Sequence, residues 1–164
     1  MMLMYAMVTM LVAACAPAPV ANFAGTWTFD PAATQTSATE AKMQPVAIFS
    51  TAFTAEQTAA ALTLHITLGP STVDATYKLD GSPSKNVSPP AVQNGQPIEV
   101  TSTAKWDGDR LSITSTSQSP SASGPVDVKS VRTMWLDANG RLVIERTGTP
   151  TIVVASSRSV YTKK

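Results

Sequence analysis

The stretch that decides the fold is Phe23-Ala24-Gly25-Thr26-Trp27-Thr28-Phe29-Asp30. Its aromatic residues and Gly25 fall on one face of an extended strand, while Ala and Thr fall on the other. Gly25 inside the run permits the bend that closing a sheet into a barrel requires. Pro31 then ends the strand, because proline cannot donate a ladder hydrogen bond. We therefore expect the first strand of a closed antiparallel barrel, with Trp27 filling one end.

The composition indicates one domain without a nucleic-acid partner. A chain of 164 residues suits a single domain. Only 14% of the residues are charged and the formal net charge is +1, so there is no electrostatic footprint for nucleic acid. Thr and Ser are abundant while Glu is rare, which favours strands with one solvated face over helices.

Short alternating runs bounded by turn residues continue to the C-terminus. After a loop over 32–44 with room for a helical turn, the pattern predicts strands over 46–51, 62–68, 73–79, 98–106, 111–116, 126–136, 142–146 and 152–161. Residues 54–60 favour a turn or short helix because Ala, Glu and Gln do, and 82–96 read as a turn-rich loop. The fold predicted is an all-β, up-and-down antiparallel barrel of about 8–9 strands, which leaves no exposed sheet edge. A two-sheet β-sandwich is the alternative.

An apolar leader precedes the first strand. Residues 1–14 carry no charge and are too short to span a bilayer as a mature helix, which is typical of a secretory signal. Val12-Ala13-Ala14-Cys15 resembles the bacterial lipobox, in which the Cys becomes the lipidated first residue. We therefore expect a signal peptide over 1–14, lipidation of Cys15, a linker over 15–22 and the barrel over 23–164. The leader departs from the signal pattern in having no Lys or Arg before the apolar run. Two alternatives stay open: cleavage after Ala18, where Ala16-Pro17-Ala18 fits a small-x-small site, and a buried hydrophobic terminus.

The leader also predicts a location in the bacterial cell envelope. Ala16 after the Cys implies, by the behaviour of bacterial lipoproteins, a lipid anchor at the periplasmic face of the outer membrane. Without lipidation the protein would be periplasmic or secreted. Because the chain has one Cys, it cannot form an intramolecular disulfide.

Two motifs resemble those of a known family. Gly25-Thr26-Trp27 resembles the Gly-x-Trp signature that opens the first strand of lipocalins. The stretch 78–86 resembles a loop of small secreted bacterial lipocalin-like proteins, which are mostly uncharacterised. The resemblance implies a calycin-type barrel with a ligand in its lumen. It also implies an Arg from a late strand over the opening Trp, and Arg158 or Arg146 over Trp27 would be the equivalent.

The sequence shows no catalytic or metal-binding constellation. His65 is the only His and lies on the polar phase of its strand, where no base or ligand partner is adjacent. One His and one Cys make neither a zinc nor a haem ligand set. No phosphate loop, nucleophile elbow or dinucleotide fingerprint is present. We predict that the protein is not an enzyme and needs no cofactor.

Three arginines on the last three strands are the candidate ligand-binding residues. Arg132, Arg146 and Arg158 share strand phase with apolar residues, so they would point into the lumen if those phases face inward. Buried guanidinium groups need an anion, so the hypothesis is a cavity that clamps an amphipathic anion such as a fatty acid. The alternative is that each Arg lies near a strand end with its head in water. Trp106 and Trp135 are core or barrel-wall aromatics that could also line a ligand pocket.

The leading functional hypothesis is an extracytoplasmic lipocalin-like binding protein, held at a membrane by its lipid anchor, with a small apolar or anionic amphipathic ligand in the barrel. The alternative is an envelope interaction or structural module, whose loops over 32–44 and 82–96 contact a partner while side chains fill the lumen. The lumen decides between them, since an open cavity favours a ligand and a packed interior favours an interaction role.

Overall fold

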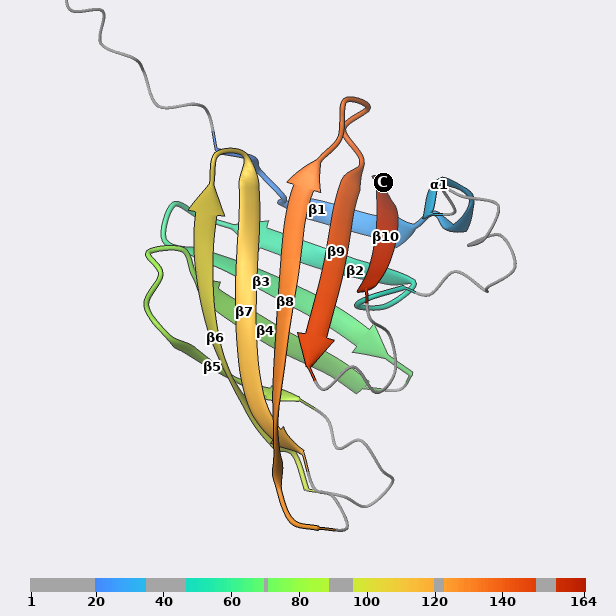
Figure 1. The fold of residues 1–164 in the computed structure, drawn as a ribbon. Helices are drawn as coiled ribbons and strands as arrows, with labels where there is room; N and C mark the ends of the chain where they lie inside the picture. The colour runs from blue at the N-terminus through green and yellow to red at the C-terminus, as the bar shows by residue number, and fades with distance from the viewer. Residues whose placement is uncertain (1–19, 35–46, 70, 89–95, 120–122, 150–155) are drawn as a thin grey trace, which may run out of the picture.

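The protein folds into one antiparallel β-sheet that curls into a nearly closed barrel (Figure 1). The structure, a computed structural model, describes residues 20–34, 47–69, 71–88, 96–119, 123–149 and 156–164. The elements are β1 (Gly25–Phe29), α1 (Pro31–Thr34), β2 (Ala52–Gln57), β3 (Ala61–Leu68), β4 (Ser71–Lys78), β5 (Ser84–Ser88), β6 (Ile98–Asp107), β7 (Arg110–Ser119), β8 (Val126–Leu136), β9 (Leu142–Thr149) and β10 (Ser156–Lys163).

The predicted up-and-down barrel is confirmed, with ten strands in place of eight or nine. The strand order is β4-β3-β2-β1-β10-β9-β8-β7-β6-β5, so strands adjacent in sequence pair as hairpins and β1 pairs with β10. That last pairing sets Phe29 opposite Tyr161 and Trp27 opposite Lys163. A single sheet holds all ten strands, which excludes the two-sheet sandwich.

Two strands were missed by the sequence prediction. Residues 54–60 were assigned to a turn or short helix, but β2 runs over Ala52–Gln57 and buries Phe53 and Ala55 against the core. The two-residue alternation of that burial overrides the helix propensity of Ala, Glu and Gln. The predicted strand over 46–51 has no ladder in the structure. Within the predicted loop over 82–96, residues Ser84–Ser88 form β5.

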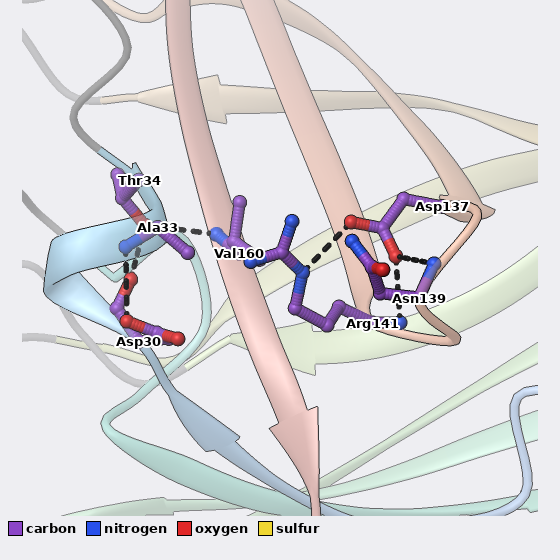
Figure 2. A network of polar contacts seen from close by, with 7 residues as sticks. All are labelled: Asp30, Ala33, Thr34, Asp137, Asn139, Arg141 and Val160. Atoms are coloured by element: carbon purple, nitrogen blue, oxygen red, sulfur yellow. Dashed lines mark hydrogen bonds and ion pairs between the residues drawn. The ribbon is translucent and has the colours of Figure 1, made fainter.

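The end of β1 is fixed by a short helix. Asp30 caps α1, because its side chain accepts a hydrogen bond from the Ala33 amide at 2.9 Å, and Pro31 occupies the first helical position (Figure 2). The Thr34 hydroxyl accepts a hydrogen bond from the Val160 amide at 3.0 Å and so ties α1 to β10. The helix therefore covers the outer face of the barrel beside Val160, which is 1% exposed.

The β8–β9 hairpin turn is closed by one carboxylate. Asp137 accepts hydrogen bonds from the backbone amides of Asn139 and Arg141, each at 2.9 Å, and pairs with Arg141 Nε at 2.8 Å (Figure 2). Burial opposes ionisation, but these hydrogen bonds outweigh it and lower the pKa of Asp137.

The core fills one end of the barrel, which we call the closed end. Trp27 is 1% exposed, and its indole Nε1 donates to the Phe23 carbonyl at 2.7 Å. Phe23 in turn stacks on Trp106, with ring centroids 5.7 Å apart. The turns that follow β2, β6 and β8 lie at this end, and the last two are at the top of Figure 1. Large side chains therefore fill the barrel at the end where the turns after β2, β6 and β8 lie.

The barrel has a seam between β4 and β5, the one pair of neighbouring described strands without a backbone ladder. The Asn86 side chain accepts a hydrogen bond from the Thr76 amide at 2.8 Å and donates one to the Thr76 carbonyl at 3.1 Å. Ser84 Oγ accepts a hydrogen bond from the Lys78 amide at 2.9 Å. An Asn side chain carries the same donor and acceptor as a peptide group, so Asn86 replaces a ladder pair. Between residues 71–75 of β4 and the described residues of β5 no hydrogen bond forms.

Candidate functional site

A cavity of about 220 Å³ lies toward the opposite end of the barrel, which we call the open end. Its wall is mainly apolar and comes from β3 and β4, together with Phe49 from the segment before β2. Its polar groups come from β5, β6 and β8. The lining residues are Ile48, Phe49, Ile66, Leu68, Val73, Ala75, Tyr77, Asn86, Val87, Ser88, Val100, Ser102 and Arg132. The cavity thus spans both sides of the seam.

A row of small residues explains why the lumen is not filled at this level. On the inner face, the register aligns residues of five neighbouring strands: Ser84, Ser102, Ser115, Ser130 and Gly148. The four serines are buried, and Ser102 and Ser115 share a hydrogen bond of 2.9 Å. Ser and Gly side chains are too short to fill the lumen at this level. Toward the closed end, the corresponding row consists of large side chains that fill the lumen: Trp106, Leu111, Met134 and Ile144.

Arg132 lies on the inner face next to this row and borders the cavity. Its guanidinium carbon is 5.4 Å from the centroid of the Phe49 ring, a cation–π contact. Its Nε is buried and has no hydrogen-bond partner in the described structure. Burial lowers the pKa of Arg132, Tyr77 opposes that shift, and the positive charge of Arg146 adds to it. The structure thus carries a desolvated cation beside an apolar cavity.

Tyr77 is the ionisable neighbour of Arg132 in the cavity wall. It is 5% exposed, and burial raises the pKa of its hydroxyl although the Arg132 charge opposes the shift. The phenol therefore stays neutral at physiological pH and cannot neutralise Arg132.

In the described strands the carboxylates lie only on the outer face of the barrel, whereas basic residues lie on both faces. Every carboxylate in the described strands lies on the outer phase: Glu56, Asp74, Glu99, Asp107, Asp127 and Glu145. Basic side chains of the outer face contact these acids, as in the pairs of Lys85 with Glu99 at 3.0 Å and of the His65 ring with Asp74 at 2.8 Å. Arg132 and Arg146 face inward, where no described strand provides a carboxylate.

Two of the predicted ligand-binding residues face away from the lumen. The register pairs Arg158 with Glu145 and Trp135 with Val143, on the face opposite to the core. The prediction that Arg158 points inward was wrong because its companion Val160 is buried on the outer face, where α1 is bonded to β10. An apolar phase in β10 therefore marks the face beside the helix, not only the lumen.

The other predicted aromatic and arginine positions divide between the two ends. Trp135 cannot line the lumen, and on the outer face the Arg110 guanidinium lies 4.3 Å from its ring centroid. Trp106 faces inward but stacks on Phe23 at the closed end, outside the cavity lining. Arg146 is on the inner phase opposite Arg132, and its side chain is exposed.

The cation over Trp27 is a lysine, so the expectation of Arg158 or Arg146 there was wrong. Lys163 Nζ lies 5.7 Å from the centroid of the Trp27 ring. Its side chain passes so close to Gly25 that a Cβ at that position would collide with the Lys163 stem, and Gly25 has a φ of 136°. Glycine is therefore required at this point of the Gly-x-Trp motif.

Sequence reasoning missed three polar or aromatic members of the site: Phe49, Asn86 and the inward-facing Ser102 with its row. A signal for the row was present, since Ser102 and Ser115 occupy apolar-phase positions of two predicted strands. Nothing in the sequence marked Asn86, because its role depends on a seam that only the tertiary structure creates.

No group of three or more His, Cys, Asp or Glu side chains in the described ranges is arranged to hold a metal ion. The described residues include no helix with the length and apolar character needed to cross a membrane. No family model matches the chain, and no curated protein matches it. The lipocalin-like assignment therefore stays a prediction. Cys15 and the leader over 1–14 lie outside the described residues.

Proposed function

We propose that the protein is an exported, lipocalin-like binding protein that holds a small apolar or anionic amphipathic molecule in the cavity at its open end, without enzymatic activity. The observation that carries the proposal is Arg132, whose buried Nε has no partner and whose side chain borders an apolar cavity.

The energetics of Arg132 support a ligand with an acidic group. A buried charge is costly unless it is paired, and no described strand supplies a carboxylate on the inner face. A bound carboxylate would complete the hydrogen bonding of the guanidinium in the fork geometry that Arg favours. The cation–π contact with Phe49 stabilises the guanidinium in part but leaves the Nε hydrogen without an acceptor.

The cavity sets the size of the ligand. An engineered apolar cavity of about 150 Å³ takes up a benzene molecule. The cavity of about 220 Å³ therefore suits an acid group with a short apolar body. A longer chain would leave the barrel past Leu68, which lines the cavity and is 41% exposed. This open end favours ligand binding over the alternative of a barrel filled by its own side chains.

The leader supports the cellular part of the proposal. An uncharged apolar segment over 1–14 followed by Cys15 fits an exported lipoprotein of the bacterial envelope, anchored at the periplasmic face of the outer membrane or otherwise periplasmic or secreted. In that location the barrel would meet ligands outside the cytoplasm, with the membrane within reach of its lipid anchor.

Calorimetric titration of the delipidated protein with octanoate, decanoate and dodecanoate tests the function. We expect saturable binding by the wild-type protein and at least about tenfold weaker binding by Arg132→Ala, which is the loss expected for about 1.4 kcal/mol. Arg158→Ala is the matched control, because Arg158 lies on the outer face, and it should bind as the wild type does. Equal binding by Arg132→Ala would disprove the role of Arg132. The absence of binding to any of the three acids and to the corresponding alcohols would disprove the function.

A further inference from the structure

We propose that the head group of the ligand carries two negative charges and is held between Arg132 and Arg146, as a phosphate monoester or a geminal dicarboxylate would be. This inference rests on the binding function proposed above and narrows its ligand class.

The first observation is the position of the two arginines. The register sets Arg132 of β8 directly opposite Arg146 of β9, so both side chains project from the same, inner face. Residues opposite each other in an antiparallel pair have Cβ atoms about 4.5–5.5 Å apart, and like charges at such positions destabilise the sheet. The Arg146 charge also acts on Arg132 directly, since it lowers the pKa of that residue. Arg132 borders the cavity, and Arg146 projects from the neighbouring position of β9 with its side chain exposed.

The second observation is the treatment of a comparable arginine on the other face. Arg158 lies directly opposite Glu145, and its Nε is 4.0 Å from a Glu145 carboxylate oxygen. Arg158 also has one buried nitrogen, Nη1, without a hydrogen-bond partner, but an acid lies beside it on the neighbouring strand of the outer face. The inner face offers Arg132 and Arg146 no carboxylate from any described strand. Arg132 is desolvated and has no partner for its Nε, whereas the Arg146 charge is exposed to solvent. A monocarboxylate would pair with Arg132 and leave Arg146 free to contact a second negative charge.

The two guanidinium groups differ in depth, which defines how a head group would enter. Arg132 is half-buried at the cavity, whereas Arg146 is exposed. A head group between them meets Arg132 on its inner side and Arg146 on its solvent side. A phosphate monoester carries about −1.5 to −2 charges near neutral pH and three acceptor oxygens, enough for both guanidinium forks. Its apolar tail would lie along Ile66 and Leu68.

The test compares ligands whose alkyl tails have seven or eight carbons: octyl phosphate, octylmalonate, octanoate and octanol, each titrated by calorimetry. We expect the two dianions to bind about tenfold tighter than octanoate, as one added charge-assisted contact would give. Octyl phosphate should lose affinity as the pH falls through its second pKa of about 6. In Arg146→Gln the advantage of the dianions over octanoate should disappear, while octanoate binding persists through Arg132.

Arg158→Gln is again the control, because it removes one positive charge from the outer face and should leave the ratio unchanged. A loss of the ratio in Arg158→Gln equal to that in Arg146→Gln would assign the effect to overall charge and overturn the inference. Dianions that bind no tighter than octanoate would also overturn it, and the binding function would stand. If none of the four compounds binds, the proposed function fails as well. Circular dichroism melting of each variant confirms that the barrel is folded.

Discussion

The closed end and the open end of the barrel are built from the same strands, but their inward-facing side chains are large at the closed end and small at the open end. At the closed end, Trp27, Phe23 and Trp106 pack in contact. At the open end, a row of serines and Gly148 leaves a cavity of about 220 Å³, with Arg132 at its edge. The comparison teaches that the inner face of one sheet can hold a packed core at one level and a cavity at the next, because side-chain size changes from row to row.

The two ends should contribute unequally to stability, and the largest effect is expected at the closed end. Trp27→Ala should lower the free energy of unfolding by about 3–5 kcal/mol, the usual loss for a buried Trp. Leu68→Ala, at the open end and 41% exposed, should lower it by less than about 1 kcal/mol. Urea denaturation followed by circular dichroism measures both. Similar losses for the two variants would contradict the division of the barrel into a core and a binding space.

The open end should trade stability for binding at Arg132. Replacing Arg132 with Met keeps most of the side-chain volume and removes the desolvated charge, so the ligand-free protein should gain about 1–2 kcal/mol of stability. The same variant should lose affinity for acidic ligands. Arg158→Met is the comparison. Arg158 also has a buried nitrogen without a hydrogen-bond partner, but its replacement removes the contact with Glu145 on the outer face, so this variant should not be stabilised. Thermal melting of the ligand-free proteins gives the answer, and a destabilised Arg132→Met would show that this residue has a structural role.

The smallest expected effect concerns the seam, where side chains join the two edge strands of the sheet, β4 and β5. Asn86→Ala removes both hydrogen bonds to Thr76, a group that water can partly satisfy, and should cost about 1 kcal/mol. Amide hydrogen exchange should accelerate at Thr76 while Leu64, in a full ladder of β3, keeps its protection. Asn139→Ala, in an exposed turn, is the control. Unchanged exchange at Thr76 would mean that Asn86 does not hold the seam.

The architecture could be predicted from the sequence because most strands show a local two-residue alternation bounded by turn residues. The alternation of the predicted strands over 98–106 and 62–68 reflects burial of one face, and both strands appear in the structure. β2 and β5 were not predictable in the same way. β2 is composed of residues with helix propensity, and β5 contains Ser, Lys and Asn, so only pairing with β3 or β6 makes them strands.

The candidate site was predictable in residue type but not in location. Arg132 and Arg146 do face inward as the phase suggested, whereas Arg158 does not, because the apolar phase of β10 is created in part by α1 on the outside. Tyr77 lies within the predicted strand over 73–79, but its place beside Arg132 arises from strands far apart in sequence. The sequence shows which residues of a strand share a face. Whether that face is the inner or the outer one depends on the elements that pack against it.

The pairing of β1 with β10 has a consequence for how the polypeptide acquires its shape. The Thr162 hydroxyl donates to the Thr28 carbonyl across 134 positions of sequence. A nascent chain emerging from the ribosome can form hairpins early, but β1 must wait for β10 before its second edge is occupied. Contacts of such long range slow folding. Until that moment one edge of β1 stays unpaired, and the barrel cannot close.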